Sequence, residues 1–494
     1  MKIYCLFMRS SRRGKLLLRN TARAQRLRRA QSYKKADRGA EIERKIMVSN
    51  LETKQTGLHK NGQFKNSLGF VLACVGSAVG MGNIWLFPYR LGQYGGAAFL
   101  IPYFIFVALF GMVGLSAEFA IGRRAKTGTL GAYEYCWNAR GKGKIGYLLG
   151  WIPLFGSLGI AIGYSVILGW VLKTLFAGVT GELLVADSAA LFNEMASPLG
   201  NIPCHTLMIV IACVLLIFGA TKGIEKVNKF MMPAFFVLFL VLAVRVFFLE
   251  GASEGYRFLL IPKWEYLLMA DTWIMAMGQA FFSLSITGSG MIVYGSYLGK
   301  DEDIIKSCRN TAIFDTLAAM LSAFAIMPAV FAFGIEPASG PPLMFITLPQ
   351  VFAHMPFGRF FAVMFFLSVA FAGITSLINM FEAVSESWQT RFKMSHTTAV
   401  TICGIIALAV GLFIEDGDRV GTWMDFITIL VVPFGALLGA VSVYYVLGYK
   451  ETKEELEMGR EKPLPKIFGF LSKYVYVPIA VAVFILGIIY KGIG

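Results

Sequence analysis

The chain has few charged residues for its length. Only 15% of its 494 residues are Asp, Glu, Lys or Arg, whereas about 25% is typical of soluble globular domains. Hydrophobic residues make up 56% of the chain. A composition this poor in charge excludes an ordinary water-soluble domain and indicates that most of the chain lies in a lipid bilayer.

Cysteine and histidine are also scarce. Seven cysteines and four histidines are scattered along the chain, without a CxxC pair. A disulfide framework needs paired cysteines, and a zinc site recognisable from sequence needs several Cys or His residues at short spacing. The sequence therefore supports neither.

The chain contains many long apolar stretches. About twenty apolar residues span the hydrocarbon core of a bilayer, and eleven stretches reach or approach that length. We therefore expect an all-α integral membrane protein that crosses the cell membrane many times. The stretches are residues 68–88, 97–122, 145–176, 202–220, 229–249, 270–298, 310–333, 359–390, 397–414, 422–448 and 467–490.

The net charge of +16 is concentrated in one segment. Residues 1–66 hold 18 Lys and Arg against 4 acidic residues, so the remaining chain is nearly neutral. This distribution argues against nucleic-acid binding by the body of the chain. The segment lacks the apolar core of a secretory signal, and its charge density predicts a disordered tail. The tail either contacts anionic lipid, is simply solvated, or precedes a start at Met47.

Basic residues in the loops predict the orientation. Alternate loops hold 20 Lys and Arg on the side of the N-terminus and 7 on the other side. Positive loops stay in the cytoplasm. We therefore expect a cytoplasmic N-terminus and an external C-terminus.

Two of the apolar stretches carry polar and flexible residues at mid-membrane depth. The first contains Gly76, Gly80, Gly82 and Asn83. Glycine permits a helix to unwind, although the GxxxG spacing of Gly76 and Gly80 is equally typical of close helix packing.

The sixth stretch has the same character five spans later. It holds the polar or small residues Gln279, Ser283, Ser285, Thr287, Gly288, Ser289 and Gly290. Unwound backbone inside a membrane must be buried or line a cavity. Interrupted helices at matching positions of two halves indicate a transporter site at the midplane, where free amides attract a carboxylate and free carbonyls hold a cation.

Six ordered motifs carry a family resemblance. They are Gly76 to Trp85 with Phe87-Pro88, Gly95 to Tyr103, Glu118 with Gly122-Arg123, Lys222 to Lys226, Gly278 to Ser285, and Ala372 to Ser376. With these motifs, residues 65–490 resemble the neurotransmitter:sodium symporter family, in its bacterial eleven-helix branch. The resemblance implies a transporter domain over 67–490, with inverted repeats at 67–249 and 270–448 and an added helix at 467–490.

The resemblance also implies two sodium sites. The second site would use the carbonyls of Gly76, Val79 and Ala372 with the hydroxyls of Thr375 and Ser376. The first would use the Ala78 carbonyl, Asn83, Ser283, Asp315 and the carboxylate of the substrate. Neutral oxygens suit a monovalent cation that must leave again. Taken alone, hydroxyls such as those of Thr375 and Ser376 more often pack between helices and bond back to the i−4 carbonyl.

Asp315 departs from the Asn common at this position in the family. An acid inside a membrane is costly and indicates a function, unless it forms a salt bridge or stays protonated against a neighbouring helix. Chloride-dependent relatives have Ser where this chain has Ala319. We therefore expect Asp315 to supply the fixed negative charge, so that transport needs no chloride.

The substrate implied by the resemblance is a neutral, apolar amino acid. Family members that carry biogenic amines have Asp at the position of Gly80, which here leaves room for an α-carboxylate. The expected contacts are Ala78, Val79, Gly80, Gly82, Tyr164, Phe281, Phe282, Ser283, Ser285 and Ser376, with Ile160 and Met380 beside them. The segment 286–290 is one residue longer than usual, so positions after Ser285 are not transferred.

The outer gate is expected to differ from the family's arrangement. Relatives pair an Arg just before Phe-Pro with an Asp of the tenth helix; here Leu86 stands in the Arg position. Arg90, one turn later, is the expected partner of Asp425.

The predicted function is sodium:amino acid symport by alternating access. The acids Glu118, Asp315 and Glu382 have no neighbouring His, metal cluster or nucleophile at catalytic spacing, so we do not expect an enzyme. A channel or an amino acid sensor on the same fold is the alternative.

Overall fold

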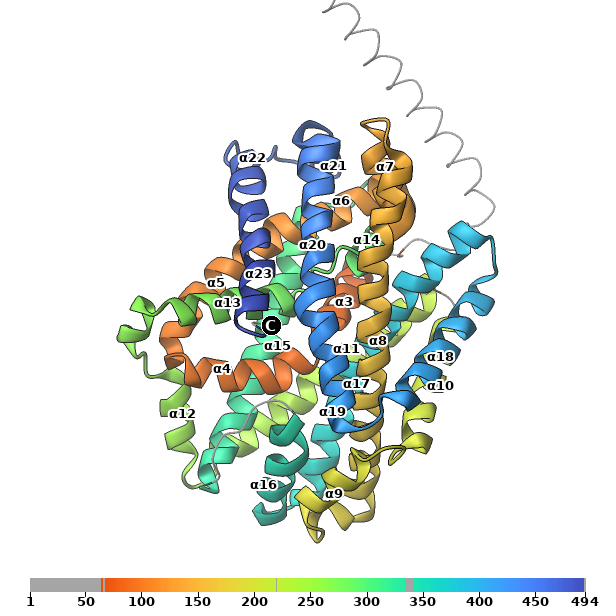
Figure 1. Ribbon diagram of the computed structural model, residues 1–494. Coiled ribbons are helices and arrows are strands. Elements are labelled where there is room, and N and C mark those ends of the chain that lie inside the picture. The colour runs from red at the N-terminus through yellow and green to blue at the C-terminus, as the bar shows by residue number, and fades with distance from the viewer. Residues whose placement is uncertain (1–63, 65–66, 219, 335–340, 493–494) are drawn as a thin grey trace, which may run out of the picture. The chain divides into compact units, whose positions relative to one another are not determined.

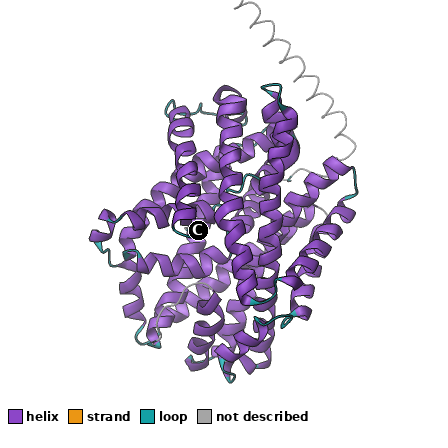
Figure 2. Ribbon diagram, viewed as in Figure 1, coloured by secondary structure: helices purple, strands orange, loops and turns teal. Residues whose placement is uncertain are grey.

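The computed structural model describes residues 64, 67–218, 220–334 and 341–492. Within these ranges every regular element is a helix, and Figure 2 shows the helices joined by short loops. The predicted all-helical membrane fold is confirmed. Apart from Phe64, the basic segment 1–66 lies outside the described residues.

Eight spans in the described part of the chain are long and apolar enough to cross a bilayer (Figure 1). Their helices are α5 (Leu100–Leu109) with α6 (Leu115–Ala125), α8 (Gly143–Thr180), α11 (Ala220–Phe247), α15 (Ile304–Ala332), α17 (Gly358–Phe392), α18 (His396–Phe413), α19 (Gly417–Asp425) with α20 (Val432–Val441) and α21 (Tyr449–Glu457), and α22 (Phe468–Phe470) with α23 (Val477–Ile489).

The first predicted span is a bent pair of helices. Helix α3 (Ser67–Ala78) stops before Gly80, and a π-helical turn (Gly82–Leu86) leads into α4 (Phe87–Gln93). The two parts meet at an angle of 63°. The break falls where the sequence predicts it. Glycine has a low helix propensity, so the glycines in this segment favour an interruption of the helix.

The sixth predicted span is interrupted as well. Helix α13 (Ala270–Ser283) and α14 (Gly290–Ser296) are separated by six non-helical residues. Ser285 and Gly288 have φ angles of 52° and 74°, which is the left-handed region that ends a right-handed helix. The Gly288 N–H donates to Glu118 Oε1 on α6 at 2.8 Å, so a buried carboxylate satisfies backbone that the break leaves unpaired.

Shorter helices complete the fold. They are α7 (Thr129–Asn138), α9 (Ser188–Met195), α10 (Ile202–Ile217), α12 (Ala252–Leu260) and α16 (Leu348–His354). Helix α10 occupies the fourth predicted stretch. Each of the eleven predicted stretches thus contains a helix or an interrupted helix.

Large apolar side chains remain exposed on outward-facing helix surfaces. On α11, Val237, Leu240 and Val244 are each more than half exposed and follow one another at helical spacing. Such a stripe is unfavourable in water but is the ordinary surface of a helix in hydrocarbon. The orientation of the spans relative to the cytoplasm stays a prediction.

Helices α6 and α14 pack backbone to backbone at two glycines. A Cβ on Gly122 would lie 1.9 Å from the carbonyl oxygen of Ile292, and one on Gly295 would lie 2.5 Å from that of Phe119. Small residues allow this approach between membrane helices. The contact holds α14, the second part of the interrupted span, against the helix that carries Glu118.

Replacement of Gly122 by Ala is expected to destabilise the fold. The added methyl group meets main-chain atoms that cannot rotate away, and overpacking of this kind costs about 1–3 kcal/mol. Gly421→Ala is the matched control, because nothing lies within 4 Å of a Cβ at that helical position. Thermal unfolding of the detergent-purified variants measures the difference. An equal unfolding temperature for Gly122→Ala and the parent chain contradicts the packing argument.

Candidate functional site

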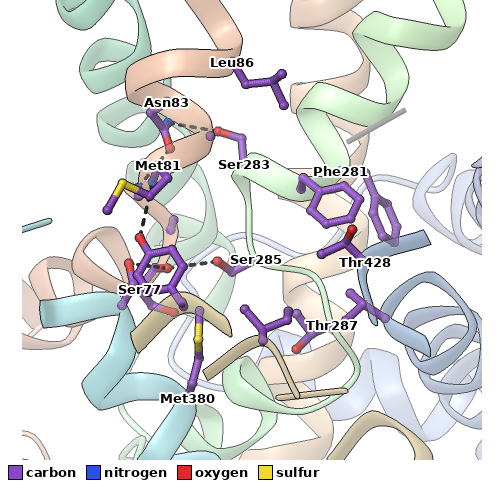
Figure 3. A pocket seen from close by; sticks show the side chains of 18 of the residues that line it. Ser77, Met81, Asn83, Leu86, Phe281, Ser283, Ser285, Thr287, Met380 and Thr428 are labelled. Atoms are coloured by element: carbon purple, nitrogen blue, oxygen red, sulfur yellow. Dashed lines mark hydrogen bonds between the residues drawn. The ribbon is translucent and has the colours of Figure 1, made fainter. Parts of the chain in front are cut away.

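A cavity of about 260 Å³ lies between the two helix breaks. Figure 3 shows it closed in by side chains from both interrupted spans, with Met380 and Thr428 from other helices. All residues predicted to contact substrate line it except Val79, and so do Ile160 and Met380. Most of the lining is apolar, with a few polar groups that converge, as in sites for small molecules.

The polar wall of the cavity is organised by Asn83. Its side-chain amide donates to Ser283 Oγ at 3.0 Å and to Asp315 Oδ1 at 2.8 Å. Its oxygen accepts the Gly80 N–H at 3.1 Å. One residue of the first interrupted span thus contacts Ser283 in the second interrupted span (Figure 3) and Asp315 on α15.

Asp315 is fully buried. Besides the Asn83 amide, its carboxyl group accepts the Ser283 hydroxyl at 2.6 Å through Oδ2. Two directed donors stabilise a carboxylate that burial alone would disfavour. The structure therefore brings together the three side chains predicted for the first sodium site, and Ala78 lies on the same cavity.

A second group of oxygens surrounds Ser376. Its hydroxyl lies 3.1 Å from the Gly76 carbonyl, 3.1 Å from that of Val79 and 3.2 Å from that of Ala372. The Thr375 hydroxyl lies 2.9 Å from the Ala372 carbonyl. These are the five residues predicted for the second sodium site, contributed by α3, its break and α17.

The spacing of these oxygens suits a hard cation. Oxygens held roughly 2.4 Å from such an ion lie about 3.4 Å apart when they subtend a right angle at it. The contacts of the Ser376 hydroxyl with carbonyls, from 3.1 to 3.4 Å, have this spacing. Carbonyl oxygens freed by a helix break replace the water of a monovalent ion without binding it too tightly.

Two further hydrogen bonds close the cavity wall. The Met81 N–H donates to the Tyr164 hydroxyl at 3.3 Å, and the Ser285 hydroxyl donates to the Ser77 carbonyl at 3.0 Å (Figure 3). The first places a phenol beside the amides of the first break. The second joins the two breaks directly.

Residues 61–198 and 193–492 match the model of the Sodium:neurotransmitter symporter family. The chain belongs to this family. A relative described as an uncharacterized sodium-dependent transporter, YhdH of Bacillus subtilis, is 34% identical over 86% of this chain and 97% of its own length. A sodium-dependent transporter of Haemophilus influenzae is 31% identical over 89% of this chain and 99% of its own.

A solved structure has the same fold. MhsT, crystallised in complex with L-phenylalanine, superposes with a TM-score of 0.77 at 30% identity and covers 86% of this chain and all of its own. The chain is thus a sodium-dependent transporter of the family, with interrupted helices in the membrane.

The structure does not bring the expected gate residues of this symporter together. Arg90 is buried, and its guanidinium donates to Gln279 Oε1 at 3.4 Å. Asp425 is exposed at the end of α19 and forms no ion pair within the described part of the chain.

The tenth span contributes residues to the cavity that the sequence reasoning missed. Met424, Thr428 and Val432 line it. Their spacing of four residues places them on one helix face, but a helix that is apolar all round gives no sign of which face is turned inward.

Removal of the Ser376 hydroxyl is expected to weaken sodium binding. Ser376→Ala takes one oxygen from the carbonyl cluster, so about tenfold more sodium should be needed for the same rise in unfolding temperature. The matched control is Ser368→Ala, two turns earlier on α17. Among the described residues its hydroxyl bonds only to the Met364 carbonyl of its own helix. Thermal unfolding at constant ionic strength, with potassium replacing sodium, measures both. An unchanged sodium dependence in Ser376→Ala contradicts the assignment.

Proposed function

We propose that this transporter is a sodium-driven symporter of a neutral, apolar amino acid and works without chloride. The main support for this proposal is that residues of the proposed first sodium site also form one wall of the cavity. Asn83 and Ser283, which contact the buried Asp315 carboxylate, also line the space in which a solute would lie.

In the proposed first sodium site, the ion lies among the Ala78 carbonyl, Asn83, Ser283 and Asp315. The α-carboxylate of the substrate completes the coordination. A ligand shared between ion and substrate makes each bind more tightly in the presence of the other, and this reciprocity is the basis of coupling.

In the proposed second site, sodium ties the first break to α17. The ion lies among the carbonyls of Gly76, Val79 and Ala372, and the hydroxyls of Thr375 and Ser376 complete its coordination. Because the site spans two elements, its occupancy favours the conformation in which they lie together.

The residues that line the cavity support an apolar amino acid as the substrate. Phe281, Phe282, Ile160 and Met380 give it apolar walls, and its size suits one small solute. Gly80 places no charged group where an amine-binding Asp would stand. The Tyr164 hydroxyl and the amides of the first break would hold the carboxylate, while carbonyls of the second break would receive the amino group. The similarity to MhsT bound to L-phenylalanine supports the same class.

Transport then follows from alternating access. Sodium stabilises the conformation with the outer side open, the substrate completes the first site, and a movement of the interrupted helices relative to α8 and α17 opens the inner side. Sodium and substrate binding are coupled because neither ligand alone completes the first sodium site.

A binding screen of the twenty amino acids tests the proposed substrate. We expect apolar members, L-phenylalanine among them, to raise the unfolding temperature of the purified protein in sodium and to lose most of this effect in potassium. Charged amino acids serve as the control and should have no effect. Stabilisation by charged amino acids alone, or stabilisation that is equal in potassium, contradicts the proposal.

Chloride independence rests on the position of Asp315. Its carboxylate is a fixed negative charge at the place where a chloride-dependent relative would hold an anion. Ala319, one turn later and buried, offers no hydroxyl to an added anion. An anion next to a buried carboxylate would be repelled.

Uptake is therefore expected to be unchanged when gluconate replaces chloride. Asp315→Asn should lose most uptake in either medium because the fixed charge is gone. The double variant Asp315→Asn with Ala319→Ser regains an anion-binding hydroxyl and should be stimulated by chloride. Uptake by the parent chain that collapses in gluconate refutes chloride independence.

A further inference from the structure

A second cluster of buried polar side chains lies outside the transport cavity. Asn201 and His205 stand at the first turn of α10, and Glu415 lies in the connection between α18 and α19. Their exposed fractions are 2%, 0% and 1%. None of the three lines the cavity between the helix breaks, so transport as proposed above makes no use of them.

The second contact of Ser165 favours the His205 tautomer that carries its proton on Nε2. Its Nε2 lies 3.0 Å from Ser165 Oγ. The Ser165 hydroxyl hydrogen is directed to the Ile162 carbonyl at 2.7 Å, so the serine oxygen accepts and Nε2 donates. A neutral imidazole with a proton on Nε2 has a lone pair on Nδ1.

That lone pair is turned toward another acceptor. Nδ1 of His205 lies 3.9 Å from Glu415 Oε1. In the described structure Nδ1 has no hydrogen-bond partner. Neither Glu415 oxygen forms a well-aligned hydrogen bond, although the Asn201 backbone lies near that carboxylate. Two acceptors do not stabilise each other, and unpaired buried groups of this kind cost free energy. A cation between them would satisfy both.

Asn201 adds a third unsatisfied group. It occupies the N-cap of α10, yet its side chain accepts no capping bond from the helix, and neither its amide oxygen nor its nitrogen has a partner. Asn at this position ordinarily caps. Its amide is therefore free to serve as a ligand.

Glycines on two neighbouring helices make room for the cluster. A Cβ on Gly169 of α8 would lie 3.0 Å from Asn201 Nδ2, and a Cβ on Gly411 of α18 would lie 2.4 Å from His205 Cε1. Burial raises the pKa of the Glu415 carboxyl, while the Asn201 backbone and the Lys173 ammonium act in the opposite direction.

We propose that Asn201, His205 and Glu415 form a binding site for a divalent transition-metal ion such as Zn²⁺. An imidazole nitrogen next to a carboxylate favours such ions over Na⁺ or Ca²⁺, which prefer oxygen ligands alone. Bonds of about 2.1 Å to nitrogen and oxygen bridge a 3.9 Å separation with a wide angle at the metal. Ser165 fixes the tautomer of the ligand, as outer partners of metal-bound histidines do.

The site would join the start of α10 to the connection that leads into α19. Helix α19 continues into the span whose residues line the transport cavity. Only one histidine, one carboxylate and one amide are available, so the bound metal would exchange with the medium. We therefore expect the ion to bind reversibly to the folded protein.

Zinc titration of the purified full chain, after treatment with a chelator, tests the proposal. Calorimetry should show one saturable site for Zn²⁺, and saturation should raise the unfolding temperature. His205→Gln and Glu415→Gln should each weaken binding at least about tenfold, and Ser165→Ala should weaken it roughly tenfold through loss of the tautomer bond. His354→Gln, at an exposed histidine of α16, is the control and should bind zinc like the parent chain.

A second measurement removes dependence on the folding of the variants. Cu²⁺ bound to the parent chain should give an electron paramagnetic resonance spectrum with coupling to a single imidazole nitrogen. Absence of saturable zinc binding, absence of this coupling, or zinc binding unchanged in both His205→Gln and Glu415→Gln overturns the proposal.

Discussion

Backbone hydrogen bonding in a medium without water is the constraint on which this structure depends. A helix satisfies its own amides and carbonyls, so each break at mid-membrane depth exposes groups that need other partners. The protein supplies them from distant elements: Glu118 accepts the Gly288 N–H, and the Ser376 hydroxyl lies among the carbonyls of the first break. The same exposed groups that threaten stability are the ones able to hold a cation and a carboxylate.

The partners of the two breaks also explain how separate elements are coupled. Asn83 joins the first interrupted span to Ser283 and Asp315, and Ser285 joins the second to Ser77. A ligand that enters between them exchanges protein hydrogen bonds for its own, so its binding changes how firmly the spans are held together. The metal site proposed at Asn201, His205 and Glu415 follows the same logic, because an ion there would give buried polar groups a partner.

Much of the fold could be predicted from the sequence. Apolar length predicts the spans, and glycines and hydroxyls at membrane depth predict the breaks at Gly80 and Thr287, because both signals are local. Tertiary placement is not local. Nothing in the sequence shows that Thr428 faces the cavity or that Arg90 bonds to Gln279 rather than to Asp425. The spacing of the histidines along the chain did not predict the proposed metal site, because His205 and Glu415 meet only through the packing of α10 against the end of α18.

Sodium-dependent accumulation in proteoliposomes tests directly whether the protein is a sodium-driven symporter. With a sodium gradient directed inward, we expect a radiolabelled apolar amino acid to reach a higher concentration inside than outside. An ionophore that dissipates the gradient should release it. Equilibration without accumulation would indicate a channel, and binding without uptake would indicate a sensor. Either result would contradict sodium-driven symport.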